Sequence, residues 1–178
     1  MNKYTNENPL TVETPVHRVF GTKKNSDYID RKGAYIIPLK DDKVGVIETA
    51  KGFFLIGGGM EYGESEEHCI IRECIEETGY QVEIKQRICS AETYCEHLTV
   101  GFFHPIQVYY SGILLEKIRK SSEADHALRW ISIESVPSRM VLEMQSWAIM
   151  QVWERSMQSE KRFQNNTAPV RRRKLVGK

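Results

Sequence analysis

Residues 58–80, GGMEYGESEEHCIIRECIEETGY, contain acidic side chains whose spacing indicates chemistry. If residues 65–78 form a helix, Glu73, Glu76 and Glu77 lie on one arc of its surface, because positions three and four apart are neighbours on a helix. Like charges at this spacing repel each other, and acids near the C-terminal end of a helix oppose its dipole. A helix that tolerates both penalties suggests a counter-cation, and hard divalent cations prefer carboxylate oxygens.

Three glycines, Gly57, Gly58 and Gly59, stand between an apolar run and this helix. Glycines permit a tight turn and a close approach of the backbone to a ligand. Their carbonyl groups could complete the coordination of a metal, and their amides could bind phosphate. No Gly-Lys-Ser/Thr sequence follows, so the run is not a Walker A loop. Acidic helix faces are usually only solvated and glycines often mark only a turn, but the combination favours a site.

The segments around this helix are expected to hold it against a sheet. Ser65 is the expected N-cap of the helix and Gly79 suits its end. Strand-like segments are expected at residues 33–39, 43–49, 52–56, 80–94, 99–110 and 127–132. A second helix is expected at 138–159, where apolar side chains recur at helical spacing. This order predicts an α/β fold with a central mixed β-sheet covered by helices.

The composition fits one globular domain with polar ends. The chain has 178 residues, of which 40% are hydrophobic and 28% are charged, and its net charge is +1. Seven basic residues and no acid lie in 161–178; without these seven charges the first 160 residues carry about −6. We predict an N-terminal arm or edge strand at 1–30, the main domain at 31–160, and a basic, disordered tail at 161–178.

Several classes of protein and site are not expected. The sequence has no apolar segment typical of export and none long enough to span a membrane, which favours a cytoplasmic protein without a membrane partner. The four cysteines are expected to be free thiols, and the five histidines show no metal-ligand spacing, so structural or surface roles are expected for them. The basic tail lacks the aromatic residues typical of RNA-binding segments, so nucleic acid is not an expected partner.

The acidic segment resembles the Nudix box, the pattern G-x5-E-x7-R-E-U-x-E-E-x-G-U, in which U is a bulky aliphatic residue. The fixed positions are occupied by Gly58, Glu64, Arg72, Glu73, Glu76, Glu77 and Gly79. Cys74 and Tyr80 stand at the two U positions. Both residue types can be buried, so this departure is expected to change packing and not chemistry.

The resemblance implies a fold, a cofactor and roles for the site residues. Nudix proteins have an α/β/α sandwich fold, bind Mg²⁺ or Mn²⁺ at the box, and typically hydrolyse a nucleoside diphosphate linked to another moiety. The implied metal ligands are Glu73, Glu76, Glu77 and the backbone carbonyl of Gly57. Glu64 would support the loop, and Arg72 would hold Glu73 by a charge-assisted hydrogen bond. Gly58 and Gly59 would lie against the substrate.

The resemblance leaves the general base and the substrate open. The base would be Glu73 or a glutamate of a later segment, for which Glu92 and Glu123 are the candidates. Tyr94 is a candidate for stacking on a nucleobase. The substrate expected first is an oxidised nucleoside triphosphate such as 8-oxo-dGTP, with dinucleoside polyphosphates, ADP-ribose and non-nucleotide diphosphates as alternatives. A non-catalytic nucleotide sensor is the rival function, and a homodimer would be in keeping with the family.

Overall fold

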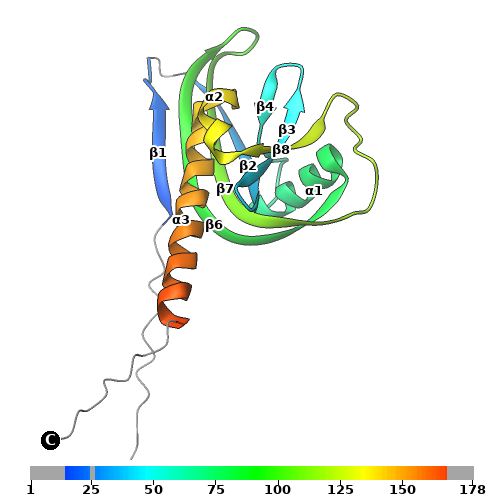
Figure 1. The fold of residues 1–178 in the computed structure, drawn as a ribbon. Helices are drawn as coiled ribbons and strands as arrows, with labels where there is room; N and C mark the ends of the chain where they lie inside the picture. Colours follow the sequence, from blue (N-terminus) through cyan, green and yellow to red (C-terminus); the bar gives the residue numbers. More distant parts are fainter. Residues whose placement is uncertain (1–14, 25–26, 168–178) are drawn as a thin grey trace, which may run out of the picture.

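A mixed β-sheet with helices on both faces organises the chain (Figure 1). The computed structural model describes residues 15–24 and 27–167. The strands are β1 Val16–Gly21, β2 Ile29–Lys40, β3 Lys43–Thr49, β4 Gly52–Phe54, β5 Ile56–Gly59, β6 Tyr80–His97, β7 Gly101–Lys117 and β8 Ala127–Ser132. The helices are α1 Glu66–Thr78, α2 Val136–Arg139 and α3 Glu143–Thr167, and a 3₁₀ turn covers Ile133–Ser135. This architecture confirms the predicted α/β sandwich.

The strand pairing places the glycine run beside the centre of the sheet. The order is β1-β6-β7-β2-β3-β4, with β5 paired to β2 and β8 paired to β3. Strands β1 and β6 are parallel, as are β7 and β2, whereas β6 and β7 are antiparallel. Gly57 of β5 lies opposite Tyr35 of β2, and Gly59 lies opposite Gly33. A turn at residues 41–42 joins β2 to β3.

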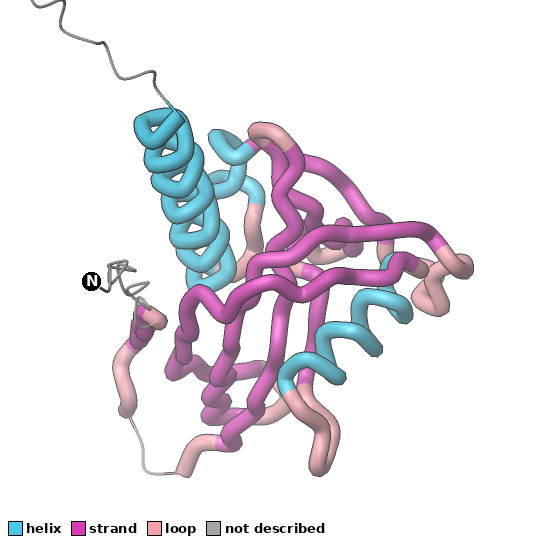
Figure 2. Tube along the Cα trace, turned by 90° about the horizontal axis from the view of Figure 1, so that it is seen from below, coloured by secondary structure: helices cyan, strands magenta, loops and turns pink. Residues whose placement is uncertain are grey.

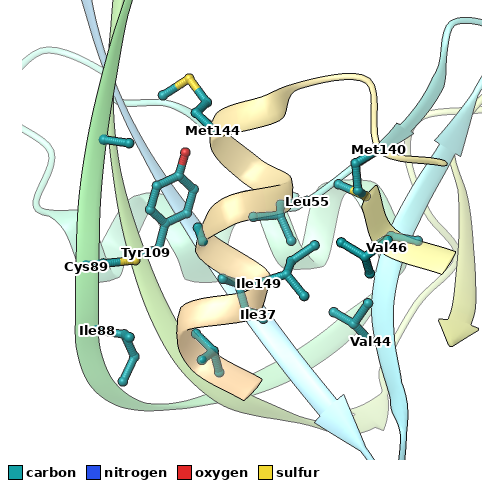
Figure 3. Close-up of a cluster of buried hydrophobic side chains, with 14 of the residues drawn as sticks. Ile37, Val44, Val46, Leu55, Ile88, Cys89, Tyr109, Met140, Met144 and Ile149 are labelled. Carbon is teal, nitrogen blue, oxygen red and sulfur yellow. The ribbon is translucent and has the colours of Figure 1, made fainter. Parts of the chain in front are cut away.

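Two apolar clusters fill the space between the sheet and the helices. In Figure 2, α1 and α3 lie on opposite sides of the strands. One cluster joins α3 to the sheet, and Figure 3 shows Met144 of α3 near Tyr109 and Ile149 of α3 near Leu55. The other cluster joins α1 to the sheet and includes Ile70. Burial of apolar surface on both faces therefore fixes α1 on the strand that carries the glycines.

Helix α1 begins and ends at the residues that the sequence predicts. The Ser65 side chain accepts a hydrogen bond from the backbone N–H of His68 at 3.2 Å. Gly79 has φ 77° and its N–H donates to the carbonyl of Ile75. This left-handed conformation favours glycine because a Cβ there meets the backbone. Both caps hold the acidic helix in a defined position relative to the glycine run.

Gly79→Ala is expected to destabilise the protein more than Gly63→Ala. Both glycines have φ 77°, but a Cβ on Gly79 would lie 2.0 Å from the Arg119 carbonyl oxygen, whereas a Cβ on Gly63 has no neighbour within 4 Å. Gly63→Ala should therefore cost only the left-handed backbone term of about 1–2 kcal/mol. Gly79→Ala should cost at least about 1 kcal/mol more, because backbone atoms must move. Urea unfolding of both variants measures the difference; equal losses would contradict the contact.

The C-terminal part differs from the predicted single helix at 138–159. Helix α2 begins earlier, at Val136, and the chain then leaves helical geometry at Met140. Met140 forms an isolated parallel β-bridge with Phe53, and the N–H of Val141 donates to the Phe53 carbonyl at 3.1 Å. Pairing with β4 thus interrupts the helix, which helical periodicity alone does not reveal.

Helix α3 also passes the predicted start of the tail at residue 161. It continues to Thr167, and no glycine or proline interrupts residues 143–167. Residues 168–178, which include the basic cluster at 171–174, and residues 1–14 lie outside the described residues. Within the part of the chain that the structure describes, no helix combines the length and apolar character that a membrane crossing requires.

Candidate active site

Arg72 organises the acidic residues of α1 and the loop before it. Its Nε donates to Glu64 Oε1 at 2.8 Å, and its Nη1 donates to Glu73 Oε1 at 2.7 Å and to Glu76 Oε2 at 3.2 Å. Its Nη2 donates to the carbonyl of Gly59 at 3.2 Å. Hydrogen bonding to Arg72 lowers the pKa of Glu64 to about 2. One guanidinium therefore joins the loop, the glycine run and two carboxylates of the helix.

Glu77 is a buried carboxylate that faces the glycine run. Only 7% of the residue is exposed, and its Oε2 accepts the Gly57 N–H at 2.9 Å. Burial raises the pKa of Glu77 to about 8; the charges of Glu73, Glu123 and Glu76 act in the same direction, and the hydrogen bond from Gly57 opposes them. Burial also raises the pKa of Glu73, although Arg72 lowers it. Charging both carboxylates is therefore unfavourable in this site unless a further cation is bound.

Close contacts on both sides of β5 leave no room for a side chain at Gly57 or Gly58. Gly57 has φ 134°, and a Cβ there would lie 2.3 Å from the Ala34 carbonyl oxygen. A Cβ on Gly58 would lie 2.3 Å from Glu73 Oε1. The missing side chains let the carboxylates of α1 approach the backbone of β5 directly.

Gly58→Ala is expected to lower kcat by about tenfold or more and to change the melting temperature little. The added methyl group displaces the end of a flexible side chain, Glu73, and not the backbone. Misplacement of a group that positions the reaction by about 1 Å can cost up to 10²-fold. Gly57→Ala is the contrasting variant: it clashes with backbone atoms at positive φ and should lower stability as well. Steady-state kinetics and thermal unfolding separate the two; an active Gly58→Ala would show that the position of Glu73 is unimportant.

The segment between β7 and β8 brings Glu123 and His126 to Glu77. His126 Nδ1 lies 3.2 Å from Glu77 Oε1 and 2.8 Å from Glu123 Oε2. The segment is held to α1 because the N–H of Ser122 donates to the Glu76 carbonyl at 2.9 Å. Glu123, predicted as a candidate base, therefore reaches the box carboxylates. The sequence predicts only a structural or surface role for His126, since its nearness to Glu77 arises only in the folded chain.

Glu92 and Tyr94, two further candidates from the sequence, do not lie at the glycine run. Glu92 is in β6, where its Oε2 is 3.7 Å from His104 Nε2 and equally far from His17 Nε2. Tyr94 stacks on His104 with ring centroids 4.2 Å apart. Thr93, between them, lines a cavity beside Tyr35 instead. Because successive side chains of a strand point to opposite faces, the structure does not bring Glu92 or Tyr94 to the glycine run.

Two cavities adjoin the glycine run and share Tyr35 and Leu142 as lining residues. The larger, of about 410 Å³, is lined by Gly57, Glu77 and His126, and also by Thr49, Lys51, Phe54, Asp125 and Gln145. The smaller, of about 260 Å³, is lined by Gly59 and by Arg31, Lys32, Thr93, Cys95, Phe103 and Gln107. Each cavity thus combines basic and aromatic side chains and opens at one end of the same short strand.

The floor between the cavities is a buried polar network. Gln145 Oε1 accepts the Leu55 N–H at 2.9 Å, and Gln145 Nε2 donates to Gln107 Oε1 at 3.3 Å. Gln107 Nε2 donates to the Tyr35 hydroxyl at 3.3 Å, and the Tyr109 hydroxyl donates to Gln107 Oε1 at 2.8 Å. These bonds fix the side chains that separate the two cavities.

The donor set fits a divalent cation. Glu73 and Glu77 have raised pKa values because they are buried close to further carboxylates. A divalent cation at this point would relieve that repulsion, and carboxylate and carbonyl oxygens are the ligands that Mg²⁺ and Mn²⁺ accept. The sequence-predicted ligands Glu73, Glu76, Glu77 and Gly57 therefore have suitable surroundings.

Comparison with known proteins identifies a domain that contains this site. The family model of the NUDIX domain matches residues 30–150, which is more than half of the chain. No curated protein matches the sequence.

Solved structures show the same fold at low sequence identity. A structure titled UDP-X diphosphatase has 17% identity and a TM-score of 0.58, covering 76% of this chain and 66% of that chain. A MutT NUDIX hydrolase from Burkholderia pseudomallei has 21% identity and a TM-score of 0.56, covering 70% and 98%. The NUDIX domain of Shewanella oneidensis NrtR, complexed with ADP ribose, has 17% identity and a TM-score of 0.53, covering 74% and 90%.

Proposed function

The chain belongs to the Nudix family and is a pyrophosphohydrolase, and we propose that it cleaves the diphosphate linkage of a nucleoside diphosphate joined to a second organic group. The observation that carries this proposal is the position of Glu77. This carboxylate bonds to the glycine run and lines a cavity that shares Tyr35 and Leu142 with the second cavity. A diphosphate lying along the glycines would place one organic group in each cavity.

We assign the box residues to the cofactor that Nudix hydrolases generally use, a divalent metal ion. Glu73, Glu76, Glu77 and the carbonyl of Gly57 would hold it, and Arg72 fixes the first two of these carboxylates. A bound Mg²⁺ or Mn²⁺ neutralises phosphate oxygens and makes a water molecule more acidic. Glu64, which bonds to Arg72, would act as a positioning residue.

We assign Glu73 as the general base that accepts the proton of the attacking water. Burial raises the pKa of Glu73, which makes its carboxylate a stronger base than an exposed glutamate. Arg72 donates to Oε1, so Oε2 is the oxygen that would accept the proton. The water oxygen bonds to phosphorus, the proton moves to Glu73, and the bond to the leaving phosphate oxygen breaks with its electron pair on that oxygen. Glu123 is the alternative base, because it is the later glutamate that lies near Glu77.

The two cavities support a substrate with organic groups at both ends. Arg31 lies over Gly59, since a Cβ on that glycine would be 2.4 Å from Arg31 Nη2, and Lys51 lines the larger cavity. These cations can bind phosphate oxygens, while Phe54 and Phe103 offer apolar surface to a base or sugar. ADP-ribose, a dinucleoside polyphosphate or a nucleotide sugar would occupy both cavities. The oxidised nucleoside triphosphate predicted from the sequence would fill one cavity with its base and leave only phosphates for the other.

The experiment is a substrate panel in the presence of Mg²⁺ or Mn²⁺, with products resolved by mass. The panel contains ADP-ribose, nucleotide sugars, dinucleoside polyphosphates, 8-oxo-dGTP, capped RNA and an inositol diphosphate. The proposal expects the highest kcat/KM for a two-ended nucleotide and a mass shift from ¹⁸O water in one phosphate product. A preference for 8-oxo-dGTP would contradict the two-ended substrate. Tight nucleotide binding without any product would instead support a non-catalytic sensor.

A further inference from the structure

His126 lies where a third ligand to a cation beside Glu77 would lie. The ligand atoms of Glu77, Glu123 and His126 are all within 4.8 Å of one another. Glu77 uses Oε2 for the Gly57 N–H, and its other oxygen, Oε1, is the one that faces His126 Nδ1 at 3.2 Å. The three groups therefore converge on one point without competing for the same oxygen.

His126 Nδ1 is buried, and no hydrogen bond of acceptable geometry satisfies it. It lies within ion-pair distance of both carboxylates, but it has no hydrogen-bond partner. Among the buried side-chain nitrogens of the described residues, only His104 Nε2 also lacks a partner. A buried polar atom without a directed partner costs free energy unless something else occupies its lone pair or proton. A cation held jointly with the two carboxylates would satisfy this atom.

The backbone orients these side chains independently of any ion. The N–H of His126 donates to the Glu123 carbonyl at 3.2 Å, which closes a turn and places both side chains on the side of Glu77. The Ser121 hydroxyl lies 2.9 Å from the Glu76 carbonyl and 3.1 Å from the Glu123 carbonyl, so the turn is tied to α1. Such preorganisation is what a nitrogen ligand to a metal needs.

We propose that His126 supplies a nitrogen ligand to the divalent cation beside Glu77, so that this site prefers Mn²⁺ or Co²⁺ to Mg²⁺. Imidazole nitrogen suits first-row transition metals, whereas Mg²⁺ is bound through oxygen and keeps several waters. The inference rests on the metal site of the proposed function and adds to it a ligand from outside the box. It predicts that metal preference depends on a residue of the segment between β7 and β8.

The test uses pulsed electron paramagnetic resonance of Mn²⁺ bound to the full-length protein, because this method detects directly coordinated nitrogen. Wild-type protein saturated with Mn²⁺ should show the ¹⁴N coupling of one imidazole. The coupling should disappear in His126→Gln and persist in His68→Gln, a matched control whose side chain is exposed on α1. Absence of the coupling from the wild-type protein overturns the inference, whether or not His126→Gln folds.

Calorimetric titration separates this inference from the proposed function. In His126→Gln the dissociation constant for Mn²⁺ should rise at least about tenfold, while that for Mg²⁺ stays unchanged. Equal losses for both metals, or none, would contradict the nitrogen ligand. If Glu77→Gln abolishes Mn²⁺ binding and His126→Gln has no effect, the ligand assignment fails and the metal-dependent hydrolase remains. If Glu77→Gln binds Mn²⁺ normally, the metal site of the proposed function itself fails.

Discussion

Glu77→Gln is expected to lower kcat by about 10³-fold or more while the fold stays intact. Glutamine can still accept the Gly57 N–H, but it cannot supply the negative charge that a divalent cation requires. A loss of about 4 kcal/mol of transition-state stabilisation corresponds to this reduction in rate. Steady-state kinetics at saturating Mg²⁺ and Mn²⁺, with circular dichroism to check the fold, provide the measurement.

Glu67→Gln is the matched control, because Glu67 lies on the same helix and is exposed. This variant should keep wild-type kcat. A Glu77→Gln enzyme with turnover near that of the control would show that Glu77 does not hold the catalytic metal.

At alkaline pH, the Glu77→Gln variant should be more stable than the wild-type protein without metal. The pKa of Glu77 is about 8 in the folded protein, above its ordinary value of 4.5, so the folded state binds this proton more tightly than the unfolded state. The contribution of Glu77 to stability is therefore fully present below about pH 4.5 and is lost as the pH rises to about 8. Glutamine does not ionise, so the excess melting temperature of Glu77→Gln should grow between pH 5 and pH 9. A melting-temperature difference that shrinks over this pH range would contradict the raised pKa of buried Glu77.

Arg72→Lys is expected to lower kcat by about 10- to 100-fold, with a smaller effect on KM. Arg72 makes hydrogen bonds to Glu64, Glu73, Glu76 and Gly59 at the same time. A lysine keeps the charge but offers a single ammonium, which cannot span these four partners. The rate should fall because the carboxylates of α1 lose their fixed positions. Kinetics with Mg²⁺ and Mn²⁺ check this result.

Arg87→Lys serves as the comparison, since Arg87 pairs with Glu66 at 3.2 Å on the surface away from the glycine run. A single, partly exposed ion pair of this kind contributes little. If Arg72→Lys were as active as Arg87→Lys, the hydrogen-bond geometry of the guanidinium would have no role in catalysis.

The sequence predicts the acidic helix and its bounds correctly because these features lie within one helix and the loop before it. Helical spacing places Glu73, Glu76 and Glu77 together, and the caps at Ser65 and Gly79 set where the helix begins and ends. Local hydrogen bonds decide these features, so they can be inferred without knowledge of the rest of the chain.

The remaining site residues depend on how distant segments pack. His126 reaches Glu77 only because the segment between β7 and β8 is tied to α1, and its position in the sequence carries no sign of this. Glu92 is predicted as a candidate base because it is a glutamate downstream of the box, in a segment that the resemblance leaves open as the source of the base. Strand β6 in fact continues to His97, and the alternation of its side chains turns Glu92 toward His104.

The most direct test of the metal-dependent mechanism is an anomalous-difference map from crystals of the full-length protein grown with Mn²⁺. The metal-dependent mechanism predicts a peak within coordination distance of a Glu77 oxygen, between α1 and the Gly57 end of β5. The same crystals of Glu77→Gln should lack this peak. A map with manganese bound only elsewhere, and the wild-type box carboxylates without metal, would contradict the account.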